Sequence, residues 1–174
     1  LGTKEVDKQI VKTASELVAN EFVSFKATTL TVTAGTALAG GTNGTVSSTA
    51  HQDFLNKLES YSFNAVGCLS KDTSITGLYV QYAKRLRDKL GIKFQAVLYN
   101  TSADYEGVIN VKNAADESDI GMIYWVTGVI AGCEINKSNT NKTYDGEYTP
   151  KTEYTQAQLE TAIDSGEFVL HQVG

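Results

Sequence analysis

Short apolar runs alternate with helical patterns from residue 63 to residue 170, and this alternation limits the possible folds more than any other feature. The runs are Phe63–Leu69, Phe94–Tyr99, Val108–Val111 and Phe168–Leu170. They are rich in β-branched and aromatic residues, as buried strands are. Most of the segments between them place apolar residues at helical spacing. This order predicts the α/β class, with a largely parallel sheet flanked by helices on both faces in three layers.

Residues that favour helix ends mark the borders of the helices predicted in this region. Asp72 provides N-cap chemistry for one helix, and Gly91 follows that helix as a C′ glycine. Gly166 has the same role after the last helix. The predicted helices are one beginning at Ser48-Thr49, one running from Asp72 to Leu90, Ile120–Cys133 and Thr155–Ile163.

The first 45 residues carry shorter patterns. Val6–Val18 has apolar residues at helical spacing and is predicted as a helix. Phe22–Ala27 and Leu30–Thr33 alternate with period two and are predicted as strands. The glycine-rich segment Ala37–Thr45 follows and is predicted as a loop.

The charge balance argues against a nucleic-acid partner. The formal net charge is −5 and the isoelectric point about 5.0, whereas nucleic-acid-binding domains are basic. The densest basic group is Lys84, Arg85, Arg87 and Lys89, which lies within a predicted helix beside Asp88. We interpret this group as a solvated helix face, with a partner-docking patch as the alternative.

Apolar stretches are too short to cross a membrane. The longest candidate, Ile120–Ile135, is interrupted by glycines and a threonine, and a spanning helix needs about 20 apolar residues. We therefore predict a soluble, intracellularly made protein without membrane insertion. Cys68 and Cys133 lack the spacing of a zinc site or a CxxC pair, which predicts buried free thiols.

The patterns of nucleotide binding and hydrolysis do not fit. A P-loop needs a lysine that Gly40–Thr45 lacks, and no glycines have the GxGxxG spacing. A serine hydrolase would have to use His51 with Asp7, or His171, which no serine follows. Asp164-Ser165-Gly166 is predicted as a turn that ends a helix.

The acidic segments also have structural interpretations. Asn139–Asp145 lacks the glycine that a calcium loop carries at its sixth position. Asp116–Asp119 is interpreted as a helix N-terminus, where negative charge favours the helix dipole. The sequence therefore predicts no catalytic residue, no metal ligand and no cofactor.

Four segments without catalytic chemistry resemble segments of one protein family. They are Ala39–Gly44, Tyr61–Cys68, Tyr105–Val111 and Tyr124–Gly132, the last continuing through Asn136, Ser138, Asn141, Lys142, Tyr144, Asp145 and Gly146. In order and spacing they are similar to sheath proteins of contractile tails, from phages of Gram-positive bacteria and from phage-tail-like bacteriocins. The resemblance covers most of residues 20–170.

The resemblance implies the central domain of such a sheath protein, with a subtilisin-like topology and no catalytic triad. It implies an N-terminal helical segment over residues 1–19 and the α/β domain over residues 20–174. The chain begins without methionine and stops at Gly174 directly after an apolar run, so we expect a piece of a longer protein that also has a C-terminal sheath-core domain. Alone, this piece is expected to be a monomer.

By the same resemblance, the implied function is mechanical. Sheath subunits polymerise with copies of themselves around an inner tube, and contract to drive the tube through a target envelope. The implied partners are other copies, the inner tail tube and the baseplate. The resemblance also implies that the protein is made in the bacterial cytoplasm and becomes part of the assembled virion or tail-like particle. Two alternatives stay open: a surface-recognition module using Tyr144, Tyr148 and Tyr154, and a hydrolase on the same framework.

Overall fold

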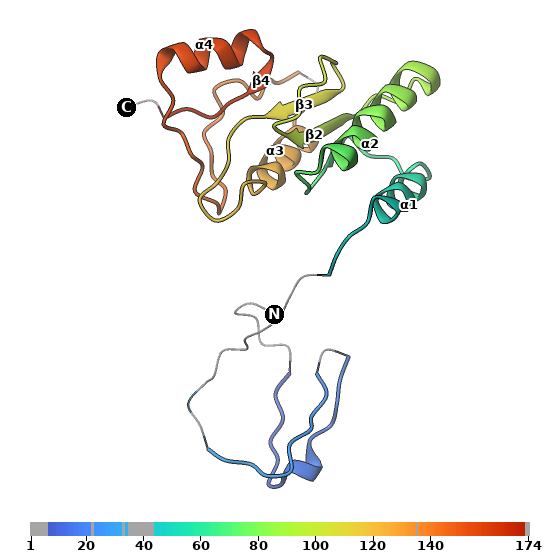
Figure 1. The fold of residues 1–174 in the computed structure, drawn as a ribbon, viewed down its shortest axis with the longest axis vertical. Helices are drawn as coiled ribbons and strands as arrows, with labels where there is room; N and C mark the ends of the chain where they lie inside the picture. The colour runs from blue at the N-terminus through green and yellow to red at the C-terminus, as the bar shows by residue number, and fades with distance from the viewer. Residues whose placement is uncertain (1–6, 22, 33, 35–43, 135, 173–174) are drawn as a thin grey trace. The chain divides into compact units, whose positions relative to one another are not determined.

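The computed structural model describes residues 7–21, 23–32, 34, 44–134 and 136–172 of the chain. The chain divides into two compact units, Leu1–Gly44 and Thr45–Gly174. All the strands and α-helices of the described residues belong to the second unit (Figure 1). The domain limits expected from the sequence, 1–19 and 20–174, stay a prediction.

Four parallel strands form the sheet of the second unit. Each strand is hydrogen-bonded to the next along the chain, and the register joins Val66 to Ala96, Val97 to Ile109 and Val111 to Phe168. The predicted α/β class and parallel sheet are therefore confirmed. The strands are β1 (Ala65–Gly67), β2 (Gln95–Tyr99), β3 (Val108–Val111) and β4 (Glu167–Phe168).

Each face of the sheet has its own apolar core, because successive side chains of a strand point to opposite faces. In the central strand β2, Ala96 and Leu98 join the core beneath α2 (Thr73–Lys84), on which α1 (Ser48–Leu58) also packs. Val97 joins the core beneath α3 (Met122–Ala131) on the other face. Burial on both faces explains why β2 is a continuous apolar run rather than an alternating one.

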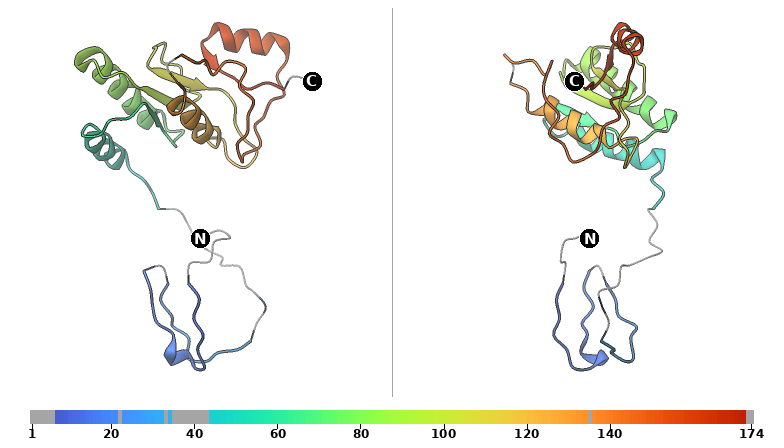
Figure 2. Two further views of the ribbon diagram at one scale, coloured as in Figure 1. Left: turned by 180° about the vertical axis from the view of Figure 1, so that it is seen from behind. Right: turned by 90° about the vertical axis from the view of Figure 1, so that its left-hand side faces the viewer.

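The last helix, α4 (Gln156–Asp164), lies on the same face as α2, opposite α3 (Figures 1 and 2). Glu167 of β4 forms an ion pair with Lys112 at 3.2 Å, and both residues line the groove beneath α4. A capping box begins the helix, with Thr155 and Gln158 each bonding the backbone N–H of the other. Gly166 follows it with φ +67°, as predicted for a helix-ending glycine.

The helix after β1 reaches its predicted end in two parts. The α-helical part, α2, ends at Lys84, and a π-helical turn, η2 (Arg85–Lys89), follows it directly. Gly91, with φ +70°, comes after this turn, as predicted for a helix-ending glycine. In this turn Leu86 lies in the core, and the Arg87 guanidinium donates to Phe94 O, just before β2, at 2.8 Å. The predicted strand Phe63–Leu69 is shorter than expected, because only Ala65–Gly67 pairs with β2.

The helix and the strands predicted for the first unit are wrong where they can be examined. The helix expected over Val6–Val18 is reduced to one 3-10 turn, η1 (Ala14–Glu16), and residues 23–32 contain no strand. None of the described residues before Gly44 is buried, so no core supports the amphipathic face of a helix there. Val6, Phe22, Thr33 and residues 37–43 of the glycine-rich loop lie outside the described residues.

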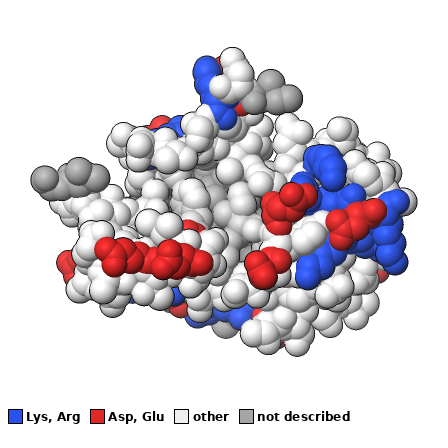
Figure 3. Space-filling view, turned by 90° about the horizontal axis from the view of Figure 1, so that it is seen from above, with Lys and Arg blue, Asp and Glu red and all other residues white. Residues whose placement is uncertain are grey.

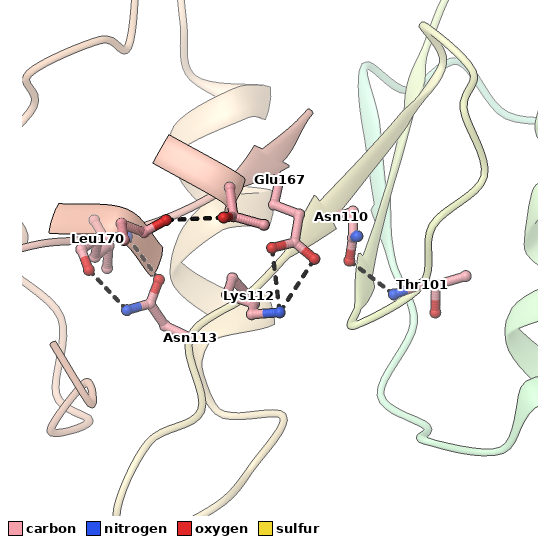
Figure 4. A network of polar contacts seen from close by, with 8 residues as sticks. Thr101, Asn110, Lys112, Asn113, Glu167 and Leu170 are labelled. Atoms are coloured by element: carbon pink, nitrogen blue, oxygen red, sulfur yellow. Dashed lines mark hydrogen bonds and ion pairs between the residues drawn. The ribbon is translucent and has the colours of Figure 1, made fainter. Parts of the chain in front are cut away.

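A polar network closes the β3–β4 edge of the sheet (Figure 4). Asn113, fully buried just after β3, donates to Lys151 O and Leu170 O, both at 2.8 Å, and accepts from Leu170 N–H at 2.6 Å. Nearby, Asn110 accepts from Thr101 N–H at 2.7 Å. A buried amide with its partners in place fixes the chain after β4 against the chain after β3. No pattern in the sequence singles out Asn113.

Candidate functional site

The two histidines have structural surroundings. His51 of α1 lies with its Nδ1 3.0 Å from the Tyr79 hydroxyl of α2, and the two rings meet edge to face. Burial raises the pKa of Tyr79 to about 12, so its hydroxyl stays neutral as a partner of the imidazole. The side chain of Asp7, the acid that a triad would need, accepts hydrogen bonds from Gln9 and Asn20 instead. His171 is exposed after β4.

The two cysteines differ in burial. Cys68 is fully buried as predicted, and burial raises the pKa of its thiol to about 11, so the thiolate is scarce at neutral pH. Cys133 is only half-buried, which corrects the prediction for this residue. α3 ends at Ala131, so Cys133 lies in the following loop, where its thiol contacts Lys137 O at 3.3 Å.

The acidic residues before α3 tie loops together. Asp119 pairs with Lys71 at 2.7 Å, and Glu117 accepts from the N–H and the hydroxyl of Thr149 at 2.9 and 2.7 Å. These contacts lower the pKa of both carboxyl groups. α3 begins later, at Met122, and no side chain caps it, so the interpretation of this segment as a helix N-terminus is wrong.

No metal site is visible in the parts of the chain that the structure describes. These parts contain no group of three or more histidine, cysteine, aspartate or glutamate side chains that could hold an ion. Asp145, the acid of the segment tested for calcium, accepts a hydrogen bond from Trp125 Nε1 at 2.6 Å. Within the same described ranges, no helix is long and apolar enough to span a membrane.

The tyrosines considered for surface recognition are loop anchors. The Tyr144 hydroxyl donates to Tyr148 O at 2.8 Å and accepts from Tyr148 N–H at 3.1 Å. The Tyr148 ring lies parallel to that of Tyr124 at 6.1 Å and covers Gly121. Tyr154 is half-buried in the groove beneath α4, and burial raises its pKa. These contacts favour the structural interpretation of the rings.

The basic group at the end of α2 divides into structural and surface residues. Figure 3 shows lysines and arginines gathered at one end of the face that it draws. The Arg87 side chain is 11% exposed and pairs with Glu106 at 2.7 Å, so its interpretation as part of a solvated face is wrong. Arg85 pairs with Glu59, and Lys84 lies 5.4 Å from the centre of the Tyr105 ring. Lys89 is exposed and forms no ion pair within the described ranges.

The second compact unit has nearly the same bounds as the match to a known protein family. Residues 44–174 match the family model of the phage tail sheath protein central domain, and the unit itself begins at Thr45. The chain belongs to the phage tail sheath family. This confirms the resemblance to sheath proteins found in the sequence.

Relatives and solved structures agree with the sheath assignment. The chain is 31% identical to the phage-like element PBSX protein XkdK of Bacillus subtilis, with 97% of the chain and 42% of XkdK covered. The structure of a sheath tail protein from Desulfitobacterium hafniense is 39% identical with a TM-score of 0.71, covering 97% of this chain and 42% of that one. A sheath tail protein from Listeria innocua is 37% identical with a TM-score of 0.66, covering 95% and 40%.

This sheath chain therefore covers only part of the length of its relatives. It spans about two fifths of each protein named above. The sequence located the family through motifs whose residues have structural roles in the fold. Tyr144 and Asp145 hold the loop after α3, while Gly67 in another motif permits close packing between β1 and α3.

Proposed function

We propose that this chain is the central domain of a contractile sheath subunit. With the rest of its protein, it polymerises with copies of itself around an inner tail tube and contracts on a baseplate signal to drive the tube through a target envelope. The observation that carries the proposal is the match of residues 44–174 to the sheath central domain. The protein is made in the bacterial cytoplasm and becomes part of the virion or tail-like particle, without binding nucleic acid or entering a membrane.

The internal contacts of the second unit support a mechanical role. Side chains tie loops of this unit to neighbouring segments: Asn113 bonds Leu170 and Lys151, Glu117 bonds Thr149, and Trp125 bonds Asp145. A subunit that transmits force must keep its own shape while its contacts with neighbours change. We infer that contraction repacks interfaces between rigid copies of this domain and leaves its interior unchanged.

Electron microscopy of the complete protein that contains this chain tests the proposal. The purified protein is expected to form tubes or stacked rings at high concentration, because sheath subunits meet through contacts that do not close. A folded protein that stays monomeric at every concentration, with and without isolated tail tubes, overturns the proposal. Circular dichroism of the same sample establishes that the protein is folded.

A further inference from the structure

A groove with a cationic rim lies at the end of α2. Its volume is about 340 Å³, and α2 and η2 supply most of its lining, with Gln52 of α1. Leu78 and Tyr82 are apolar lining residues of the groove, Tyr82 being only 4% exposed, and the Tyr82 hydroxyl is buried without a hydrogen-bond partner among the described residues. Three cationic side chains and one carboxylate complete the lining: Lys84, Arg85, Lys89 and Asp88.

The C-terminal end of α4 has the opposite character. Ile163 is 66% exposed there, between the exposed Glu160 and the exposed Asp164, and α4 has no basic residue. Neither carboxylate forms an ion pair within the described ranges. Negative charge at a helix C-terminus interacts unfavourably with the helix dipole, so Glu160 and Asp164 lower the stability of this helix end in the isolated chain. A local conflict of this kind is expected where a surface is kept for a partner.

These two surfaces lie apart on the domain. Figure 3 shows lysines and arginines gathered at one end of the face and a separate group of acidic side chains towards the side on which Figure 1 draws α4. Within one chain, Figure 3 thus shows the two charged groups apart. Two copies can bring them together in a head-to-tail contact, and such a contact leaves both outer surfaces free for further copies.

We propose that the C-terminal end of α4 docks in the α2 groove of a second copy of this chain. Ile163 packs against Leu78 and Tyr82, while Glu160 and Asp164 face the cations of the rim. The contact removes Ile163 from water and places positive charge beside the C-terminus of α4. This inference rests on the proposed function, because it names one of the contacts through which sheath subunits assemble.

A charge exchange in the complete protein tests this contact. One variant carries Glu160→Lys with Asp164→Lys, another carries Lys84→Glu with Lys89→Glu, and a third combines all four substitutions. Arg87 stays unchanged because it supports the fold. The matched control reverses two exposed charges of the loop after α3, with Lys142→Glu and Glu147→Lys.

Sedimentation of assembled protein gives the readout at about 0.1 M salt, where charges are only partly screened. Each of the first two variants is expected to raise the concentration needed for assembly about tenfold or more, whereas the combined variant restores it and the control leaves it unchanged. Normal assembly of the first two variants overturns the α4–groove contact, as does failure of the combined variant while its melting temperature is unchanged. If the unsubstituted protein does not assemble, the proposed function itself is overturned.

Discussion

The side-chain amide of Asn113 bonds both polar groups of the Leu170 backbone. Its Oδ1 accepts from Leu170 N–H at 2.6 Å, and its Nδ2 donates to Leu170 O at 2.8 Å. In a sheet, the backbone of a neighbouring strand would form these two hydrogen bonds. Leu170, however, lies beyond β4, which ends at Phe168, and the Asn113 side chain forms them instead. One buried side chain thus continues the edge of the sheet after the strand has stopped.

Asn113→Ala is expected to lower the free energy of unfolding of the chain by about 2–4 kcal/mol, because it removes three hydrogen bonds that a fully buried side chain makes with the backbone of Leu170 and Lys151. Urea denaturation followed by circular dichroism measures the change. Asn136→Ala, an exposed position, is the matched control and is expected to stay within about 0.5 kcal/mol. Equal effects of the two substitutions would show that the amide network does not stabilise the fold.

Gly67 marks the closest approach between β1 and α3. A Cβ at this position would lie 2.5 Å from Thr127 Oγ1 and 2.9 Å from Ile123 Cγ2. Gly67→Ala is therefore expected to destabilise the chain by about 1–3 kcal/mol through overpacking. Adding Thr127→Ala, which removes the nearest atom, should recover part of this loss in thermal unfolding.

Gly128 of α3 is the control for this overpacking. No atom lies within 4 Å of a Cβ built there, so Gly128→Ala is expected to stabilise the chain by about 0.5–1 kcal/mol through helix propensity. Similar losses at Gly67 and Gly128 would contradict the view that α3 packs tightly against β1.

Arg87 and Lys89 are expected to respond differently to truncation. Arg87→Ala removes bonds to Phe94 O and Glu106 from a largely buried site and should cost about 2–3 kcal/mol. Lys89→Ala, at an exposed residue two positions away, should change the free energy of unfolding by less than about 0.5 kcal/mol. Urea denaturation of both variants decides the point, and a neutral Arg87→Ala would restore the interpretation of a solvated face.

The buried thiol of Cys68 makes stability depend on alkaline pH. Burial raises its folded pKa to about 11 from an ordinary value of 9.0, so the unfolded chain loses this proton first. The stability that the neutral Cys68 thiol contributes to the folded chain is therefore fully present below pH 9 and is lost as the pH rises towards 11. Unfolding free energies measured from pH 8 to 10.5 should fall less steeply in Cys68→Ala than in the unsubstituted chain. Parallel curves would contradict this assignment.

Local signals were enough to predict much of the second unit. Thr155 and Gly166 limit α4 through contacts within a few residues, and Gly91 needs only its own left-handed backbone to end the helix before it. The apolar run of β2 follows from burial on both faces. Such features depend on neighbours in sequence or on one repeating pattern, so they can be read without a structure.

Features that depend on distant neighbours were missed. Asn113 meets Leu170 across 57 positions, and no pattern near either residue indicates this contact. Arg87 lies in the π-helical turn η2 and bonds Phe94 O and Glu106, whereas the basic pattern alone suggested a solvated face. The helix predicted over Val6–Val18 failed for the opposite reason, because its amphipathic pattern has no core to pack against in the described residues.

Helical reconstruction of the assembled tail before and after contraction tests the central claim most directly. The account predicts that residues 45–174 fit the density of both states as one rigid body, with Cα positions that differ by about 1 Å or less, while contacts between copies are exchanged. A sheath whose density does not contain this fold, or one in which β1–β4 rearrange during contraction, would contradict the account.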